Sequence, residues 1–264
     1  MEIKNTWTGN WEGAFCGMRF PMNSNDKSDS DFGIGDCYKW LESCRNEVAY
    51  SYCPNGHEDD WWEEIDYWLA ENGELRFGKY AGEYAYIGKN DLNLAQKLIK
   101  AGPPHDKFLR QIFVSADITA PLYIWKELDQ YKIATVTDST STMHKLASTP
   151  ITRDCFEMDD YNGSLKLYDR EPYNTDDYVN DMWDSIVDYC ETLRQRYLET
   201  KDERYWKELI RVLPESWLQK RHWSGNYSVI RSIVKQREGH RLSEWEQFID
   251  WALTLPYANE LLFI

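Results

Sequence analysis

The chain has 264 residues, of which 42% are hydrophobic and 15% aromatic, so it can bury a core and we expect one ordered domain. Its formal net charge is -15, and such a field repels a phosphodiester backbone, which excludes duplex nucleic acid as an expected partner. No run approaches the roughly 18 apolar residues of a membrane helix, and no signal-peptide pattern is present, so we expect a cytoplasmic protein that does not bind membranes.

In the first part of the chain, the spacing of the acidic residues does not match a metal-binding motif. Residues 21–36 are rich in Asn, Asp, Ser and Gly, which predicts a loop. Asp29 and Asp31 resemble the start of a calcium loop, but Trp40 stands where an EF-hand requires its closing Glu. Residues 51–75 are acidic around several Trp, which is typical of a solvated helix face with its aromatics inward.

The cysteines lack the pairing of a zinc knuckle or a redox motif. Cys37, Cys44, Cys53 and His57 are spaced C-x6-C-x8-C-x3-H, without a C-x-x-C step. Cys190 lies on an apolar helical stripe, where core packing explains it better than chemistry does. We therefore predict no metal ion and reduced thiols throughout.

Periodicity predicts a helix, a strand and a second helix in the middle of the chain. The helix covers 90–101, with a cap-like Asn-Asp at its start and Gly-Pro-Pro after its end. Alternating apolar residues predict a strand over 109–119, and Pro121 opens a helix over 121–131.

Three more helices are predicted at 181–199, 226–238 and 243–254, each with apolar residues at helical spacing. The last begins with Ser243 and Glu246 in the spacing of a capping box. Residues 204–241 contain nine Lys or Arg against three Glu, and a basic island in an acidic chain suits a small phosphate better than a polymer.

The middle of the chain resembles the flavin-dependent thymidylate synthases, the ThyX family. That family has a G-H-x-x-P-x-E-H segment, a strand ending in A-P, a helix, and the signature R-H-R-x-x-S-x-N-E-x-S-x-R-Y. With Ala120-Pro121 placed on the A-P, the patterns run without a gap. His105 then falls on the first His, Thr135 and Thr140 on the two signature Ser, and Asp138 on the Glu.

A second block matches further along the chain. Leu213-Pro214, Trp223, Asn226 and Arg237 follow the order and spacing of the family's L-P, W-x-x-N-A-R and later Arg. The two blocks cover about a third of the chain. The resemblance implies an α+β fold, with a small mainly antiparallel sheet flanked by several helices. It implies a single ThyX-like domain over 1–264, with a divergent N-terminal extension over about 1–90.

Several family positions carry other residues here. Arg110-Gln111 replaces the Glu-His, Gln130-Tyr131-Lys132 replaces the R-H-R, and Thr142-Met143 replaces the R-Y. Ser228 stands where the family has the Arg that supports uracil. Neither Thr142 nor Ser228 can hold phosphate or uracil oxygens bidentately, as an arginine does.

The resemblance implies FAD as a cofactor, a small phosphorylated nucleotide as ligand, and a homotetramer. It assigns no catalytic residue, and the expected ligand-binding residues are His105, Arg110, Gln111, Gln130, Lys132, Thr135, Asp138, Thr140, Asn226, Ser228, Arg231, Arg237 and Arg241. Of these, we expect His105, Lys132, Thr135, Asp138, Thr140 and Arg237 to line one pocket.

Each of these residues also has a structural interpretation. Arg237 ends a helix, where a cation is stabilised by the macrodipole, and His105 caps a loop. The 135–140 segment equally suits a hydroxyl-rich helix start capped by Asp138 or Ser139.

Two functions follow from the resemblance and from the family positions that carry other residues in this chain. The first is a ThyX-like nucleotide-binding methyltransferase with weak or altered one-carbon transfer to dUMP. The alternative is a non-catalytic protein of phage or mobile-element type that sequesters a ligand or interacts through its acidic surface. The sequence leaves open whether the chain is an enzyme.

Overall fold

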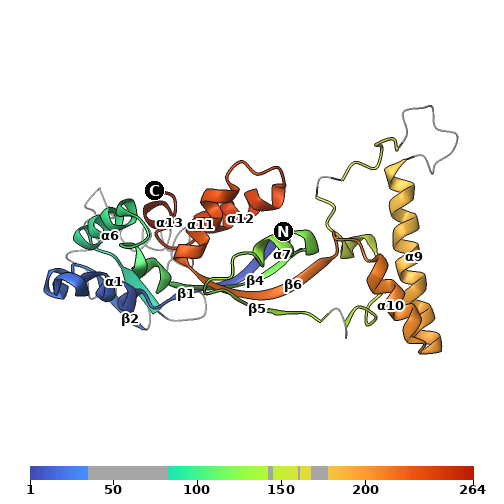
Figure 1. The fold of residues 1–264 in the computed structure, drawn as a ribbon, viewed down its shortest axis with the longest axis horizontal. Helices are drawn as coiled ribbons and strands as arrows, with labels where there is room; N and C mark the ends of the chain where they lie inside the picture. Colours follow the sequence, from blue (N-terminus) through green and yellow to red (C-terminus); the bar gives the residue numbers. More distant parts are fainter. Residues whose placement is uncertain (35–82, 142–144, 160, 168–177) are drawn as a thin grey trace, which may run out of the picture. The chain divides into compact units, whose positions relative to one another are not determined.

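The computed structural model describes residues 1–34, 83–141, 145–159, 161–167 and 178–264 (Figure 1). The strands are β1 (Glu2–Gly9), β2 (Asp31–Ile34), β3 (Glu83–Tyr86), β4 (Phe113–Pro121), β5 (Val136–Ser139) and β6 (Leu218–Asn226). The α-helices are α1 (Trp11–Arg19), α6 (Lys89–Ala101), α7 (Leu122–Leu128), α9 (Val179–Thr200), α10 (Glu203–Val212), α11 (Tyr227–Arg237), α12 (Ser243–Leu253) and α13 (Ala258–Leu261). Short 3-10 helices are η1 (Phe20–Met22), η2 (Asn25–Lys27), η4 (Lys107–Arg110) and η5 (Arg153–Cys155).

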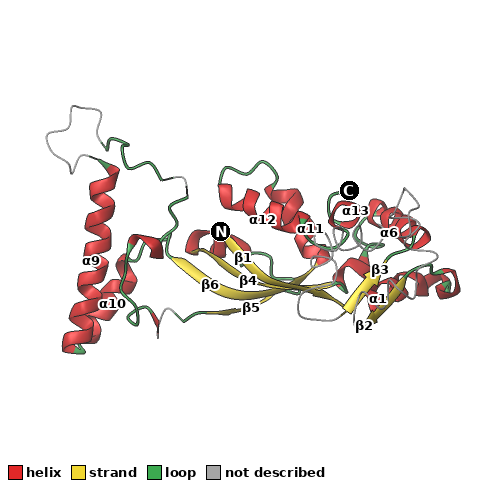
Figure 2. Ribbon diagram, turned by 180° about the vertical axis from the view of Figure 1, so that it is seen from behind, coloured by secondary structure: helices red, strands yellow, loops and turns green. Residues whose placement is uncertain are grey.

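One sheet has the strand order β1-β4-β6-β5, which Figure 2 shows side by side. β4 and β6 run antiparallel. The N–H of Tyr227 donates to the carbonyl of Ile112 at one end of the pair, and the N–H of Leu122 donates to that of Trp217 at the other. β2 and β3 form a separate antiparallel pair. The expected mixed fold with a small mainly antiparallel sheet is confirmed.

The chain groups into two compact units. The larger unit contains Glu2–Ile118, Tyr131–Thr137 and His222–Ile264, and the smaller unit contains Met1, Thr119–Gln130 and Asp138–Arg221. Strands β4, β5 and β6 each have residues in both units. The expectation of a single domain with an N-terminal extension stays a prediction.

Aromatic rings fill the core of the larger unit. Trp11 on α1 packs edge-on against Tyr227 of α11, with ring centroids 5.1 Å apart, and both side chains are fully buried. The hydroxyl of Tyr227 donates to the carbonyl of Pro256 at 2.6 Å, so its polar atom is satisfied inside the core. The side chain of Asn226 caps α11 by accepting from the N–H of Val229 at 3.0 Å.

A buried carboxylate joins the segment around residues 19–30 to α6. Asp91 is fully buried and accepts hydrogen bonds from the Nε of Arg19, from Ser28 Oγ at 2.5 Å and from Ser30 Oγ at 2.5 Å. Next to it, Asp29 accepts from the N–H groups of Asn90 and Asp91 at 2.8 and 3.0 Å. Asp29 therefore caps the N-terminus of α6 from a distant part of the chain.

Several predicted boundaries were wrong. Residues 21–36 were predicted as loop, yet they include η1, η2 and β2. α6 begins at Lys89 and is capped by Asp29 rather than by its own Asn-Asp. The strand predicted for 109–119 starts at Phe113, because residues 107–110 form η4, which packs against α1 and buries Leu109.

Two helix predictions also need correction. The helix predicted for 121–131 ends at Leu128, and Pro121 is still part of β4. The predicted capping box does not form, because Leu242 is the N-cap of α12 and makes no side-chain cap bond. Ser243 is already helical there. The remaining predicted helices, at 90–101, 181–199 and 226–238, are present with small shifts at their ends.

The smaller unit is built on the pairing of α9 with α10 (Figure 1). Its core contains Leu146, Ile151, Phe156, Cys190, Leu193 and Leu209. Glu191 of α9 ties the 147–151 segment to this core by accepting from the N–H of Ile151 at 2.8 Å and from Arg194 at 2.6 and 2.7 Å. Arg194 also donates to the carbonyl of Ala147 at 3.1 Å.

Replacing Asp91 by Asn should destabilise the protein strongly. The change leaves the guanidinium of Arg19, which is 5% exposed, without its counter-charge, and breaking a buried pair in this way costs about 3–5 kcal/mol. Chemical denaturation of Asp91→Asn measures this loss. Glu2→Gln is the matched control, because its partner Lys4 is exposed and such pairs contribute at most about 1 kcal/mol. Equal small effects of both variants would contradict the assigned role of Asp91.

Glu191 should make the smaller unit acid-sensitive. Hydrogen bonds from Arg194, and then from Ile151 and Gln195, lower the pKa of Glu191 to about 2, against burial, which raises it. The stabilisation that ionised Glu191 gives the folded state is therefore fully present above the unfolded pKa of about 4.3. It is lost as the pH falls toward the folded pKa of about 2.

Thermal unfolding followed by circular dichroism from pH 6 down to about pH 2 tests this expectation. Glu191→Gln should be less stable than the wild type at pH 6 and should lose less stability on acidification. Glu199→Gln is the control, since Glu199 pairs with Arg196 on the same helix in an exposed position. An identical pH profile for the wild type and Glu191→Gln would be the contrary result.

Candidate functional site

Burial acts on the charge of two cations on helix α11, Arg231 and Lys235. It lowers the pKa of Arg231, and it also lowers the pKa of Lys235, which the charge of Arg231 lowers further. The neighbouring Asp106 opposes this effect by raising both pKa values. Partial desolvation therefore disfavours the positive charge of Arg231, which is half-buried, while Lys235 is exposed to solvent.

The guanidinium of Arg231 is only partly satisfied. Its Nη2 donates to the backbone oxygen of Ile264 at 2.7 Å. Its Nε is buried and has no hydrogen-bond partner among the residues that the structure describes. Unsatisfied buried donors are uncommon in native proteins, and each needs an explanation.

Arg237, the last residue of α11, is held between two aromatic rings. Its guanidinium carbon lies 4.4 Å from the ring centroid of Trp245 and 5.8 Å from that of Tyr131. Its Nε donates to the Tyr131 hydroxyl at 3.1 Å, and this hydroxyl donates to Gln236 Oε1 at 3.2 Å. Stacking and hydrogen bonding together fix the plane of the guanidinium, as a phosphate-holding arginine requires.

A turn brings Thr135 to the same tyrosine. Ala134 has a left-handed backbone with φ of 58°, and the hydroxyl of Thr135 donates to the carbonyl of Tyr131. Thr135 and Arg237 therefore both contact Tyr131, although Tyr131 and Arg237 are 106 residues apart in sequence. Lys132 lies in the same turn and is exposed.

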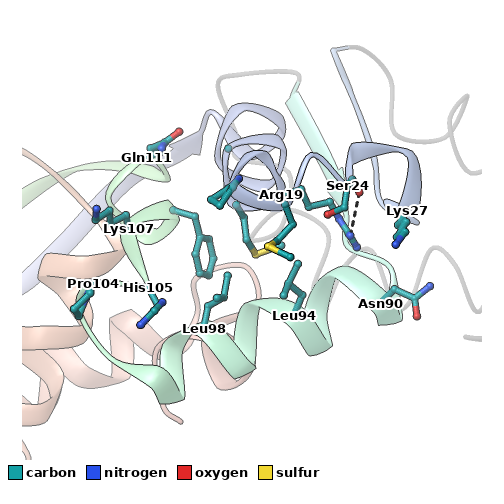
Figure 3. Close-up of a pocket in the computed structure, with 15 residues that line it drawn as sticks. Arg19, Ser24, Lys27, Asn90, Leu94, Leu98, Pro104, His105, Lys107 and Gln111 are labelled. Carbon is teal, nitrogen blue, oxygen red and sulfur yellow. Dashed lines mark hydrogen bonds between the residues drawn. The ribbon is translucent and has the colours of Figure 1, made fainter.

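A pocket of about 1040 Å³ lies between α1, the η1–η2 segment, α6 and the residues around η4. Figure 3 shows His105, Lys107 and Gln111 at one end, Ser24, Lys27 and Asn90 at the other, and Leu94 and Leu98 of α6 between them. None of its lining residues is Asp or Glu. Of the residues expected to share one pocket, His105 lines this one, together with Gln111 from the wider set of expected ligand contacts.

Other expected site residues make local structural contacts. The Gln130 side chain donates to the carbonyl of Lys126 at 3.1 Å. Thr140 donates through its N–H and hydroxyl to the carbonyl of Lys220 at 2.9 and 3.1 Å. Asn226 is the cap of α11. Ser228 is half-buried in the first turn of α11, while Arg110 and Arg241 are exposed.

The interpretation of 135–140 as a helix start is wrong. Asp138 and Ser139 lie in strand β5, which pairs with β6. Asp138 and Thr140 belong to the smaller unit, and their convergence with Lys132, Thr135 and Arg237 stays a prediction.

Sequence reasoning missed several residues. Trp245 was not singled out from the sequence, although its ring stacks on Arg237. Lys235 was counted in the basic island, but its depressed pKa depends on burial that the sequence does not show. Lys27 and Ser24 fell in a segment predicted as loop, and no sequence signal indicated that it forms a pocket wall.

Some predictions fall on residues outside the described ranges. These are the acidic 51–75 segment, Trp40, the Cys37, Cys44, Cys53 and His57 group, and Thr142 and Met143. Among the described residues, Cys16, Cys155 and Cys190 are free thiols, and no cluster of His, Cys, Asp and Glu could hold a metal ion. In the same part of the chain, no helix has the length and apolar character needed to span a bilayer.

No protein-family model and no curated protein matches the chain. Solved structures do match it in fold. The flavin-dependent thymidylate synthase ThyX from Helicobacter pylori complexed with FAD and dUMP is 14% identical and has a TM-score of 0.52, with 100% of this chain and 98% of that chain covered. A second structure of ThyX from Helicobacter pylori with FAD and dUMP is 15% identical, with a TM-score of 0.54 and coverage of 100% and 97%. The expected ThyX-like fold is confirmed.

Proposed function

We propose that the chain binds a small phosphorylated nucleotide on a ThyX-like scaffold, and that thymidylate synthesis from dUMP is absent or very weak. The observation that carries the proposal is the guanidinium of Arg237, which Trp245 and Tyr131 hold beside the turn that carries Lys132. The solved structures with this fold contain dUMP, which supports a nucleotide as the anion.

Arg237 is the proposed phosphate anchor. Its guanidinium plane is already fixed by Trp245 and Tyr131, so little side-chain entropy is lost when a ligand binds. Lys132 supplies a second charge from the turn that carries Tyr131, the hydrogen-bond partner of Arg237. Charge-assisted contacts of this kind contribute about 1.5–3 kcal/mol each.

Transfer of a one-carbon unit to dUMP needs more than the contacts that bind the phosphate. In the ThyX family, flavin carries the hydride and methylenetetrahydrofolate supplies the carbon, while the protein positions dUMP. The positions that hold phosphate and uracil there align with Thr142 and Ser228. Each missing contact to developing charge raises the barrier by about 3–4 kcal/mol, so several losses together exceed what one lysine restores.

The residues at the flavin positions do not fit FAD as the family holds it. The Gln130 side chain is bonded to its own helix, and the Tyr131 hydroxyl is engaged with Arg237 and Gln236. Neither supplies the positive charge of the family's R-H-R. We therefore derive no step through flavin. Visible absorbance of the purified protein tests whether FAD is retained.

The non-catalytic alternative is favoured by the same replacements. A protein that sequesters a nucleotide needs Arg237 and Lys132 but not the missing arginines. In that case dUMP should bind without turnover. The cytoplasmic location and the homotetramer, with active sites shared between copies, stay predictions.

An assay with dUMP, methylenetetrahydrofolate, FAD and NADPH should show no significant turnover, while calorimetry detects dUMP binding. Arg237→Ala should weaken binding by about tenfold or more, since a charge-assisted contact of about 1.5–3 kcal/mol is lost, and Lys132→Ala should weaken it in the same direction. Arg204→Ala is the control for net charge, because Arg204 is exposed and pairs with Asp202. Robust turnover would refute the loss of synthesis, and equal effects of Arg204→Ala and Arg237→Ala would refute the site.

A further inference from the structure

The pocket between α1 and α6 has the shape of a ligand site that the nucleotide proposal does not use. Its volume of about 1040 Å³ is at the upper end of the range for small-molecule sites. All of its lining residues belong to the larger unit, and most of them come from segments that the family resemblance does not cover.

The two ends of this pocket are cationic. Lys27 stands at one end with Ser24 and Asn90, and Lys107 stands at the other with His105 and Gln111 (Figure 3). Neither lysine forms an ion pair with any residue in the described ranges. In a chain with 45 acidic and 30 basic residues, a lining without Asp or Glu leaves both charges available to a ligand.

The wall of the pocket between its two ends is apolar and is formed by helices. Leu94 and Leu98 lie on α6 (Figure 3). Met18 of α1 and Phe108 of η4 also line the pocket. Arg19 also lines the pocket, but Asp91 neutralises its charge and the carbonyl of Ser24 accepts from its Nη1 at 3.3 Å. Arg19 therefore shapes the pocket, and the two lysines supply the net charge.

The length of α6 sets the spacing of the charged groups. Asn90 and Leu98 are eight residues apart, which at 1.5 Å per residue corresponds to about 12 Å along the helix. Lys107 and His105 lie beyond Leu98 (Figure 3). A short dianion cannot reach both ends at once.

We propose that this pocket binds an elongated ligand with an apolar body and an anionic group at each end, one group on Lys27 and the other on Lys107. The apolar body lies along Leu94 and Leu98, where burial of its surface adds to the binding energy. The hydroxyl of Ser24 and the amide groups of Asn90 and Gln111 supply further hydrogen bonds to the ends of the ligand.

The test compares dodecanedioate, the matched monoanion dodecanoate and the short dianion butanedioate by calorimetric titration of the full chain. Dodecanedioate should bind about tenfold or more tightly than dodecanoate, because the second charge-assisted contact adds at least one tenfold step in affinity. Butanedioate should bind no more tightly than dodecanoate. Lys27→Ala and Lys107→Ala should each remove the advantage of dodecanedioate.

Lys97→Ala is the matched control, since Lys97 is exposed on α6 and does not line the pocket. It should leave all affinities within about twofold. Equal affinity for the two long acids, no binding of either, or an equal effect of Lys97→Ala would overturn the proposal. The nucleotide site is tested separately through Arg237 and Lys132, so failure of one proposal leaves the other standing.

Discussion

The buried carboxylate of Asp91 is the interaction on which the architecture of the larger unit depends. A fully buried charge is tolerated only when it is paired and hydrogen-bonded, and Asp91 meets that condition through Arg19, Ser28 and Ser30. These bonds hold residues 19–30 against the start of α6. The pocket exists because this segment cannot move away from α6 without leaving Asp91 unsatisfied.

A second constraint comes from α11. Its apolar side, with Ile230, Ile233 and Val234, is buried, and Arg231 is half-buried beside it, while Lys235 stays exposed. The end of the same helix brings Arg237 against Trp245 and Tyr131, which hold its guanidinium. Packing of α11 therefore fixes the position of the arginine on which the proposed nucleotide site depends.

The elements with strong periodicity were predictable from the sequence. The helices at 181–199 and 226–238 and the strand predicted for 109–119 follow from apolar spacing, although the strand observed is Phe113–Pro121. The fold came from the spacing of two motif blocks around Ala120-Pro121 and Asn226, since identity to solved structures with this fold is only 14–15%.

What the sequence could not show depends on contacts between distant residues. Asp29 caps α6 from about 60 positions upstream, so the local Asn-Asp signal pointed to the wrong cap. The 136–139 segment is rich in Thr, Asp and Ser, which favour helix caps, yet pairing with β6 makes it a strand. The contacts of Arg237 with Tyr131 and Trp245 join separate segments of the chain, and no local sequence pattern predicts them.

The central claim is that the scaffold has kept a nucleotide site on α11 while losing the transfer chemistry. A crystal structure of the protein grown with dUMP tests this claim most directly. We predict that the phosphate lies in hydrogen-bond contact with Arg237 and within reach of Lys132. A phosphate bound far from α11, or a crystal without dUMP at concentrations that saturate in solution, would contradict the account.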